Sequence, residues 1–200
     1  MNRKLKFMLL KRKRFLKSED LRDEGFCKLG ENVLIHEDAN IVGFDKIAIG
    51  DNVRIDPFVS IIANANVDIG SYIHIGAYTY ISAQRAIQLH DFVNISQSVK
   101  IYTSNDDYSG ASMTNPMVPD DCKKVKLDTL TLGRHVIIGS SSVILPGCHV
   151  EEGSAVGALS FVNYSLGSWG VYAGIPVKYI RARSKALLQY ENNISEIEIQ

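Results

Sequence analysis

The sequence predicts an all-β fold in which the chain winds repeatedly around one shared hydrophobic core. Similar stretches begin at residues 29, 49, 69 and 89, so the pattern repeats every twenty residues. Inside each repeat the aliphatic residues advance in two steps of six and one of eight, as at Ile49, Ile55, Ile61 and Ile69. Each repeat therefore reads as one coil of three short strands and three turns, which is the pattern of a solenoid.

The stacking of these coils follows from their size. A single coil cannot bury its own ring of aliphatic side chains, so successive coils must share one continuous core. Alternating strands of an ordinary β-sandwich are the alternative, but they show a period of two with turns at variable spacing. A sandwich does not keep a twenty-residue register through four repeats. The repeat favours the solenoid.

The solenoid is expected over residues 29–183, interrupted by one long loop at residues 105–129. The loop is polar, contains glycine and proline, and lacks any period. The aliphatic pattern resumes by sixes from Leu132 to Val162, so the chain leaves the coils and returns to them. A loop of this length in a compact repeat protein is usually functional or disordered.

Two segments flank the solenoid. Residues 1–28 are rich in Lys and Arg, and their apolar cluster at residues 7–10 is too short to span a membrane. We expect a basic amphipathic helix that either caps the first coil or is solvated, and capping has a physical reason because an uncapped coil exposes its core and strand edges. Peripheral contact with an anionic membrane is the alternative. Residues 184–200 are expected to form a short helical tail packed on a neighbour.

Composition bounds the partners and the compartment. The 22 basic and 22 acidic residues give a formal net charge of zero, which argues against a general nucleic-acid binder. The cysteines Cys27, Cys122 and Cys148 are widely spaced and form no metal-binding motif. We therefore expect reduced thiols in a cytoplasmic protein rather than a disulfide framework.

The hexads, the single long loop, the segment from His135 to Gly147 and the stretch Ala173–Lys178 together resemble a known family. They are similar to the hexapeptide-repeat acyltransferases over about residues 29–183. The resemblance implies a left-handed parallel β-helix and an acyl-CoA co-substrate, with acetyl-CoA as the expected form and no metal. It also implies a homotrimer in which acyl-CoA lies between two subunits and the long loop reaches toward a neighbour.

The start of the loop, Asp106–Gly110, resembles enzymes of this family that acylate bacterial surface sugars. The resemblance implies transfer of an acyl group to the amino group of a nucleotide-linked amino-deoxysugar, for lipopolysaccharide or capsule synthesis. Acetyl transfer to a sugar hydroxyl is the alternative within the family.

Acyl transfer needs a proton acceptor, donors for the thioester oxyanion, and groups that hold the acceptor. Many relatives place a catalytic histidine near the base of the long loop, but no histidine lies between Lys100 and Thr131 here. Asp106 stands where the similar galactoside and maltose acetyltransferases have that histidine. We expect Asp106 to engage the attacking amine, whose proton passes to this carboxylate or to the departing thiolate. Asp107 is either a second catalytic carboxylate or a residue that caps the loop.

Four further residues are candidate substrate contacts: His90, Asp91, Ser96 and Tyr108. Asp91 and Ser96 lie in the coil that leads into the loop, and Tyr108 belongs to the loop. A structural role is the alternative for Asp91, because Asp and Ser fill its repeat position in earlier coils and such residues bond turn backbone. His90 replaces a glycine of earlier coils, so it faces the groove between subunits or is an exposed turn residue.

The coenzyme contacts are implied by the resemblance. Ser140 and Ala158 match positions where relatives bind the pantetheine arm, and Lys178 and Arg181 match positions that supply cations to the phosphates. The two cations suit the negative charge of adenosine phosphates. Ordinary surface charge is the alternative for both.

Two functions of other classes stay open. A zinc-dependent γ-type carbonic anhydrase shares the fold and needs three histidines that meet between subunits. The repeat positions of the five histidines give no such triad; they are His36, His74, His90, His135 and His149. A non-catalytic scaffold is the second alternative, and the long polar loop with its matched family positions argues against it.

Overall fold

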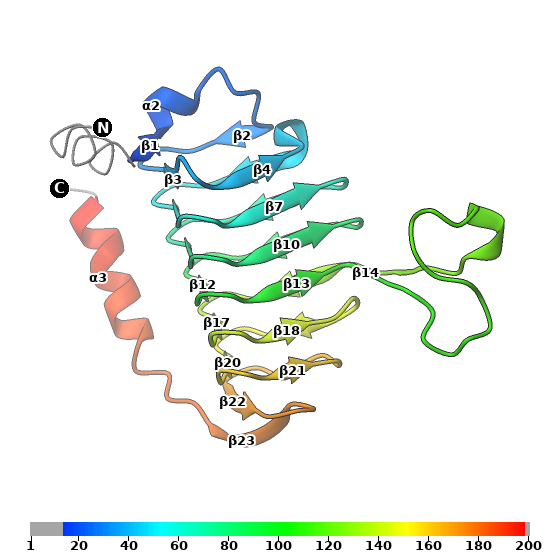
Figure 1. The fold of residues 1–200 in the computed structure, drawn as a ribbon. Coiled ribbons are helices and arrows are strands. Elements are labelled where there is room, and N and C mark those ends of the chain that lie inside the picture. The colour runs from blue at the N-terminus through cyan, green and yellow to red at the C-terminus, as the bar shows by residue number, and fades with distance from the viewer. Residues whose placement is uncertain (1–13, 199–200) are drawn as a thin grey trace, which may run out of the picture.

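The computed structural model of the chain describes residues 14–198, and it folds as a solenoid of stacked coils with three mainly parallel sheets, which we call A, B and C (Figure 1). This architecture confirms the predicted left-handed parallel β-helix with one long loop. Figure 1 shows the loop as a separate arm on one side of the coils.

The strands of each sheet follow one another from the N-terminal end to the C-terminal end. Sheet A contains β1 (Phe15–Lys17), β3 (Leu34–His36), β6 (Arg54–Ile55), β9 (His74–Ile75), β12 (Asn94–Ile95), β17 (Ile137–Ile138), β20 (Ala155–Val156), β22 (Gly170–Ala173) and β23 (Lys178–Ala182). Sheet B contains β2 (Lys28–Leu29), β5 (Ile47–Ile49), β8 (Val67–Ile69), β11 (Ile87–Leu89), β16 (Leu130–Leu132) and β19 (His149–Val150). Sheet C contains β4 (Asn40–Val42), β7 (Ser60–Ala63), β10 (Tyr80–Ala83), β13 (Lys100–Tyr102), β18 (Val143–Ile144) and β21 (Phe161–Val162).

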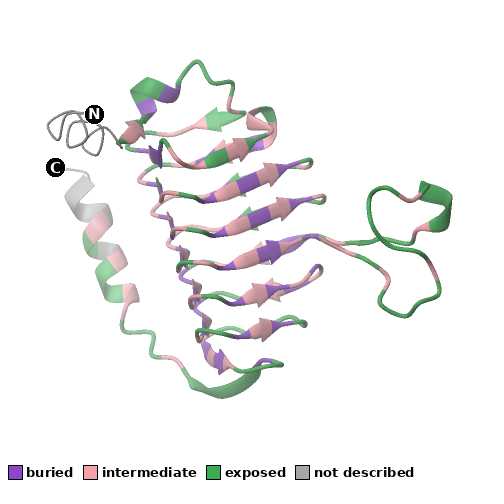
Figure 2. Cartoon of the chain, viewed as in Figure 1, coloured by how far each residue is buried: buried purple, intermediate pink, exposed green. Residues whose placement is uncertain are grey.

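The twenty-residue repeat sets the register of the sheets. Ile55 of β6 pairs with Ile75 of β9, and Ile75 pairs in turn with Ile95 of β12. Ile95 then pairs with Ile138, so the register continues across the long loop. All four side chains are fully buried. Figure 2 shows this core as buried segments along the strands, whereas the loop is largely exposed.

The corner between sheets B and A shows why small residues recur at the turns. A Cβ atom added at Gly50 would lie 2.6 Å from Ser71 Oγ, so a side chain does not fit there. The residue that follows bonds the backbone of the preceding coil, because Asp51 Oδ1 accepts from the Glu31 amide at 2.7 Å. Asp91 Oδ1 accepts from the Ser71 amide at 2.9 Å in the same way. The structural role considered for Asp91 is therefore observed.

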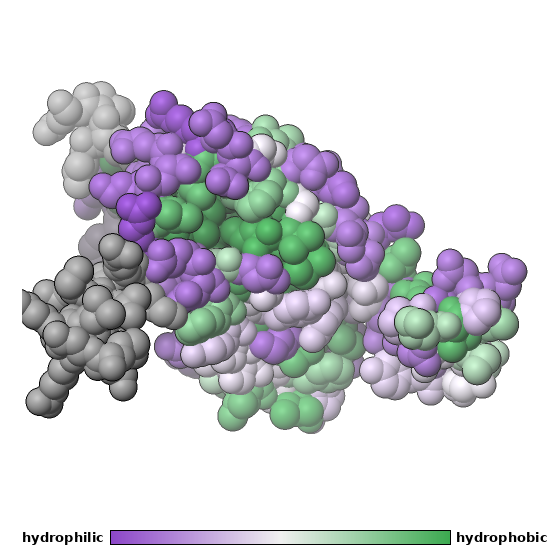
Figure 3. All heavy atoms as spheres, turned by 45° about the horizontal axis from the view of Figure 1, so that its top comes forward, coloured by the Kyte–Doolittle hydropathy of each residue, from purple (hydrophilic) through white to green (hydrophobic). Residues whose placement is uncertain are grey.

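The N-terminal end of the solenoid is covered by β1 and the short helix α2 (Ser18–Leu21). Strand β1 pairs antiparallel with β3, and Leu21 is buried in the core. Ser18 Oγ accepts from the Val33 amide and donates to the Gly30 carbonyl, both at 2.9 Å. Some apolar side chains at this end remain visible from outside, as Figure 3 shows, and Phe26 is among the half-buried residues there.

The prediction of an amphipathic helix in this segment is wrong for Phe15 and Leu16, which lie in β1. Pairing with β3 gives their backbone groups partners that helical turns would otherwise supply. The remainder of the predicted helix, residues 1–13, lies outside the described part of the chain. The two 3₁₀ turns of the structure are η1 (Phe44–Lys46) and η2 (Asp120–Cys122).

The C-terminal segment forms a helix, α3 (Leu188–Glu198), as expected. It returns along the solenoid (Figure 1), and Glu191 pairs with Arg134 and with His135 Nε2, the latter at 2.8 Å. These ion pairs join α3 to its own chain, and packing of the tail on a neighbour stays a prediction. Arg183 fixes the start of this segment by donating to the carbonyls of His135 at 2.8 Å and Gly153 at 2.9 Å.

Truncation of the core should destabilise the whole solenoid. Ile81 is fully buried in the middle of sheet C, between Ile61 and Ile101. We expect Ile81→Ala to lower the free energy of unfolding by about 2–5 kcal/mol, because it leaves a cavity that the stacked coils cannot close. Urea unfolding measures the change. Gln88→Ala on the exposed face of sheet B is the control, with an expected change below about 0.5 kcal/mol; equal effects would contradict the assignment of the core.

Candidate active site

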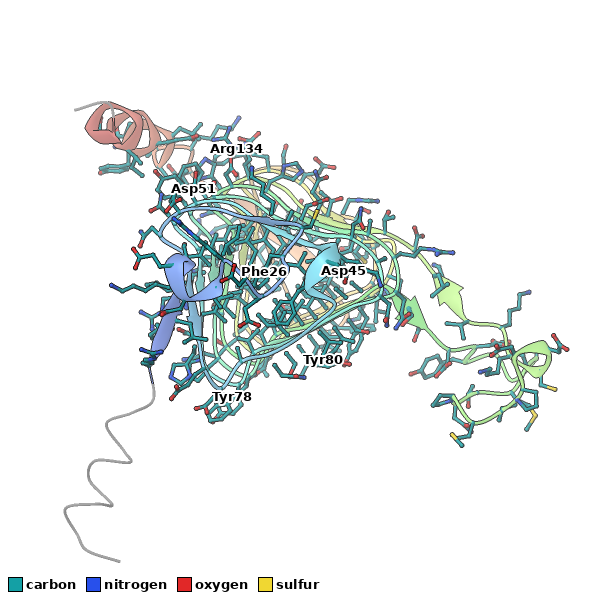
Figure 4. All side chains as sticks on the ribbon, turned by 90° about the horizontal axis from the view of Figure 1, so that it is seen from above. Phe26, Asp45, Asp51, Tyr78, Tyr80 and Arg134 are labelled. Carbon is teal, nitrogen blue, oxygen red and sulfur yellow. The ribbon has the colours of Figure 1, made fainter. Side chains whose placement is uncertain are left out.

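The three faces of the solenoid differ in character. Outward residues of sheet B, such as Asp68 and Gln88, are exposed and polar. Outward residues of sheet C, such as Tyr102, Val143 and Phe161, are half-buried and apolar or aromatic. Figure 4 looks down the coils and shows the long loop leaving one corner, Tyr78 at a second corner, and Asp51 and Arg134 at the third. The loop leaves the corner between sheets C and B.

The long loop begins and ends as a two-stranded ribbon. Strand β14 (Ser104–Asn105) pairs antiparallel with β15 (Lys126–Leu127). Thr103 anchors this ribbon, because its hydroxyl donates to the Ser82 carbonyl at 3.0 Å and accepts from the Gln84 amide at 2.7 Å. The base of the loop is thus fixed to the preceding coil.

A cavity of about 780 Å³ lies between the base of the loop and the outer face of sheet C. The loop and its ribbon supply a mainly polar side, and sheet C supplies an apolar floor. The lining residues are Ser82, Tyr102, Ser104, Asn105, Asp106, Tyr108, Val125, Val143, Leu145 and Phe161. An apolar cavity with a few polar groups at its edge is the usual form of a small-molecule site.

Asp106 and Tyr108 are the two predicted site residues that line this cavity. Asp106 is exposed, and no described residue hydrogen-bonds or pairs with its carboxylate. Tyr108 is 88% exposed. Both side chains are therefore available to a bound molecule.

Asp107 has a different environment from Asp106. Its carboxylate accepts from the Ser109 hydroxyl at 2.6 Å, the Ser109 amide at 2.8 Å and the Ser112 hydroxyl at 2.8 Å. Hydrogen bonds from Ser109, with a further one from Ser112, lower the pKa of Asp107 to about 2. Such a carboxylate is a weak base and has little free capacity to accept more bonds, so the structure favours the loop-capping role of Asp107.

Loss of the Asp107 bonds should loosen the loop without unfolding the coils. We expect Asp107→Ala to speed proteolytic cleavage within residues 106–125 severalfold, with an unchanged Tm, and limited proteolysis measures the rate. The lowered pKa means that the carboxylate holds the loop at neutral pH and releases it as the pH falls from about 4 toward 2. Asp121→Ala, at an exposed loop position, is the control; cleavage at equal rates in both variants would contradict this role.

The other predicted acceptor contacts lie away from the cavity within one chain. Asp91 bonds the Ser71 amide at the corner between sheets B and A. His90 lies near the same corner, beside Thr131 and Arg134. Neither residue lines the cavity that contains Asp106. Their predicted roles therefore gain no support from the arrangement of a single chain.

Three predicted site residues share the corner between sheets A and C. Ser96, Ser140 and Ala158 occupy turns of successive coils there. A Cβ atom added at Gly139 would lie 2.4 Å from the Ala158 amide nitrogen, which shows how closely these turns stack. The turn that follows Ala173 continues this corner, and exposed Lys178 begins β23 beside it. The predicted coenzyme residues thus lie along one edge of the solenoid, with Arg181 further along β23.

Sequence reasoning missed the apolar floor of the cavity. Tyr102, Leu145 and Phe161 alternate with core aliphatics along their strands, so the period marks them as outward but does not identify the face. Burial raises the pKa of Tyr102, with smaller contributions from Tyr80 and Tyr108. The sequence does not show which of the three sheets the loop covers, because this depends on how the chain folds. The cavity floor could therefore not be predicted.

No cluster of three or more His, Cys, Asp or Glu side chains within residues 14–198 has a geometry that would hold a metal ion. His74 lies on sheet A and bonds Asp56 and Asn94, at 2.9 and 3.1 Å. His135 stacks on Phe92 at 4.8 Å at the corner between sheets B and A, which is not the corner that the loop leaves. In the same part of the chain, no helix has the length and apolar character needed to cross a membrane.

Comparison with known proteins gives several relatives, although no protein-family model matches the chain. The chain is 43% identical over 179 residues to a dTDP-4-amino-4,6-dideoxy-D-glucose acyltransferase of Escherichia coli, which covers 89% of this chain and 93% of the relative. A putative lipopolysaccharide biosynthesis O-acetyl transferase of Escherichia coli K12, WbbJ, is 33% identical over 69 residues, or 34% of this chain and 35% of the relative.

A solved structure resembles the whole solenoid. The N-acyltransferase AntD from Bacillus cereus, in complex with dTDP and 3-hydroxybutyryl-CoA, superposes with a TM-score of 0.89 at 40% identity. The match covers 94% of this chain and 100% of that one. A serine variant of AntD, in complex with dTDP-4-amino-4,6-dideoxyglucose and coenzyme A, gives a TM-score of 0.87.

The solenoid and the cavity beneath its single loop define a β-helical acyltransferase. The 43% sequence identity to the Escherichia coli acyltransferase, over 89% of this chain, shows the family. The chain belongs to the hexapeptide-repeat acyltransferases.

Proposed function

We propose that the protein transfers an acyl group from acyl-CoA to the amino group of a nucleotide-linked 4-amino-4,6-dideoxysugar. The observation that carries this proposal is the unengaged carboxylate of Asp106 at the edge of an apolar cavity. The 43% identity of this chain to an acyltransferase of such a sugar also supports the proposal. The apolar floor suits an acyl chain and pantetheine arm, and the carboxylate suits an amine.

A sequence interval supports the joint use of Ser96 and Asp106. AntD has been crystallised as variants of one serine and of one aspartate ten residues further on. Ser96 and Asp106 have the same interval, and no other serine of the chain precedes an aspartate by ten residues. We therefore assign both residues to the acceptor.

The chemistry needs little general-base strength. The neutral amine of the sugar attacks the thioester carbonyl carbon, and a C–N bond forms as a tetrahedral oxyanion develops. Collapse of this intermediate breaks the C–S bond and releases the coenzyme A thiolate. The amine proton passes to Asp106 or to that thiolate, which leaves an amide and free coenzyme A. Asp106 holds the amine in position for the attack.

The positions of Ser96 and Asp106 support a site built from two subunits. Ser96 lies at the corner between sheets A and C, and Asp106 lies beyond the corner between sheets C and B. Strands β13 and β14 run between them, and at about 3.3 Å per residue the two side chains are on the order of 20 Å apart in one chain. One amine reaches both only if Ser96 and Asp106 come from different subunits. We propose a homotrimer with its active sites between subunits.

Complementation tests this arrangement. We expect Ser96→Ala and Asp106→Asn variants to be nearly inactive alone and to regain roughly a third of wild-type activity as mixed trimers, since one of the three two-subunit sites in each mixed trimer then joins an intact Ser96 to an intact Asp106. Turnover of the mixed oligomers, purified through two affinity tags, measures the recovery. Sedimentation should give a trimer. A fully active monomer, or mixed trimers without recovered activity, would contradict the proposal.

The proposed cellular role is the synthesis of lipopolysaccharide or capsule in the cytoplasm. The partial match to a lipopolysaccharide O-acetyl transferase supports a role in the synthesis of lipopolysaccharide or capsule. The free state of Cys27, Cys122 and Cys148 supports the cytoplasm, because disulfides persist in oxidising compartments.

The test of the function is a panel of acceptors. Purified protein is incubated with acetyl-CoA or 3-hydroxybutyryl-CoA and with nucleotide sugars that carry either an amine or a hydroxyl at the same carbon. Release of free thiol reports turnover. We expect release with the amino sugars; release with the hydroxyl sugars only would instead support the O-acetyl alternative, for which the WbbJ match is the favouring observation.

A further inference from the structure

The corner between sheets A and C carries one residue with left-handed backbone in each of five successive coils. A ladder of amide bonds aligns these residues: Ser98 N donates to the Ala77 carbonyl at 2.8 Å, and Ser141 N donates to the Gln97 carbonyl at 3.0 Å. From the N-terminal end, the aligned residues are Phe58, Tyr78, Ser98, Ser141 and Leu159. Two aromatic side chains are therefore followed by two small polar ones, Ser98 and Ser141, which we call the serine step.

The aromatic stack at this corner ends abruptly at Tyr78. The rings of Phe58 and Tyr78 are 5.0 Å apart and inclined by 20°, so the second face of Tyr78 points toward the serine step. The two residues are 44% and 58% exposed. At the corner between sheets B and A the equivalent stack continues through Tyr72, Phe92 and His135, with spacings of 4.9 and 4.8 Å. Among the described residues, no ring follows Tyr78.

The serine step lies at the level of the proposed reaction. Ser98 belongs to the same turn as Ser96, which we assign to the acceptor. Ser141 belongs to the same turn as Ser140, a predicted pantetheine contact. A ring placed against Tyr78 at this level is next to both groups.

A cation lies at the same corner. Lys100 Nζ donates to the Tyr78 carbonyl at 2.9 Å, and no described carboxylate pairs with it. Its charge is held at the corner by this bond. An ammonium without a carboxylate partner, at the same corner as an open aromatic face, complements a ligand in which a diphosphate is joined to a ring.

We infer that the hexose ring of the nucleotide sugar stacks on the free face of Tyr78, over the serine step, with its diphosphate at Lys100. The inference rests on the proposed function. The spacing between coils is about 4.8 Å, which is within the distance range for ring stacking. The face of Tyr78 is electron-rich and favours the apolar C–H groups that a dideoxysugar presents. The small side chains of Ser98 and Ser141 leave room for that ring. The corner therefore favours an acceptor that carries a dideoxyhexose.

Calorimetric titration without acyl-CoA separates the sugar contact from the nucleotide contact. The probes are dTDP and dTDP-4-amino-4,6-dideoxyglucose. We expect Tyr78→Ala to weaken binding of the nucleotide sugar about 3- to 10-fold, the effect of one lost ring contact, and to leave dTDP affinity unchanged. Tyr78→Phe should retain wild-type affinity for both. Lys100→Met should weaken both probes alike, because it removes a phosphate contact.

Two further variants sharpen the test. Ser98→Phe should exclude the sugar while dTDP still binds, and Phe58→Ala, one coil further from the step, should leave both affinities nearly unchanged. Equal losses of dTDP and nucleotide sugar in Tyr78→Ala would overturn the inference, because the ring would then contact the nucleotide. A smaller oligomer in that variant would also overturn it and assign the corner to subunit contact.

The result distinguishes this inference from the proposed function. Wild-type turnover together with unchanged sugar binding in Tyr78→Ala would refute the stacking contact alone. Absence of both binding and turnover in the wild-type protein would refute the proposed function, and the inference with it.

Discussion

Replacement of Asp106 by asparagine should lower turnover of the amino sugar by about 10²- to 10⁴-fold, the usual effect of losing a general acid or base. Asparagine keeps the size of the side chain and part of its hydrogen bonding but removes its charge and basicity. Because the acyl-CoA contacts are expected along the corner of Ser140 and Ala158, affinity for acyl-CoA should stay unchanged. Steady-state kinetics with amino sugar and acyl-CoA varied separately measure both effects.

Three controls give this result its meaning. Asp121→Asn changes a carboxylate of the same loop that does not line the cavity, and His90→Ala removes the last histidine before the loop in sequence. Both should cost less than about threefold, since neither touches the acceptor site. Asp107→Asn is expected to act through loop mobility and to change KM more than kcat. If His90→Ala abolishes turnover and Asp106→Asn does not, the carboxylate assignment is wrong.

A second outcome of the Asp106 experiment separates its two roles. If Asp106→Asn raises KM for the sugar and leaves kcat near the wild-type value, the carboxylate positions the amine and the coenzyme A thiolate takes the proton. If kcat falls at saturating sugar, the carboxylate takes part in the chemical step. Turnover by the variant at raised pH, where more amine is neutral, distinguishes loss of basicity from loss of positioning.

Removal of the loop should abolish activity and leave the solenoid folded. Strands β14 and β15 form an antiparallel ribbon, so residues 106–125 are replaceable by an Asn-Gly turn that joins Asn105 to Lys126. The coils on both sides pair with each other without the loop, for example Ile87 with Leu130. We expect a wild-type far-UV circular dichroism spectrum, a Tm within a few degrees, and turnover reduced at least as far as in Asp106→Asn.

The loop variant also tests where the cavity comes from. Its control is Asp107→Ala in the intact loop, which disturbs loop order but keeps Asp106 and Tyr108. Activity above the Asp106→Asn level in the variant without a loop would contradict a site at the base of the loop. A collapsed spectrum would contradict the independence of the coils.

Most of the fold is predictable because a repeat leaves few alternatives. The inward residues Ile55, Ile75 and Ile95 are twenty residues apart and pair in that register. The aliphatic pattern resumes at Leu132, which predicts that the loop is an insertion between two coils. Ile95 indeed pairs with Ile138 across the loop. The segment at Phe15 and Leu16 escapes this reasoning, because pairing with β3 overrides the amphipathic pattern of the short basic stretch.

The site is predictable only in part. Asp106 and Tyr108 lie in the polar loop and line one cavity, as their sequence position suggests. Asp91 lies in the coil that leads into the loop, but its carboxylate accepts a hydrogen bond from the Ser71 amide at a turn. The cavity floor at Tyr102 and Phe161 depends on which outward face the loop covers, and a period of six does not specify a face.

The most direct test of the account is the structure of the product made from acetyl-CoA and dTDP-4-amino-4,6-dideoxyglucose. We expect one thiol released for each acetyl group transferred, and nuclear magnetic resonance of the isolated product should show an amide at C4 of the sugar. The Asp106→Asn variant should form this product at least about a hundredfold more slowly. An ester on a sugar hydroxyl, or no thiol release with any nucleotide-linked amino sugar, would contradict the account.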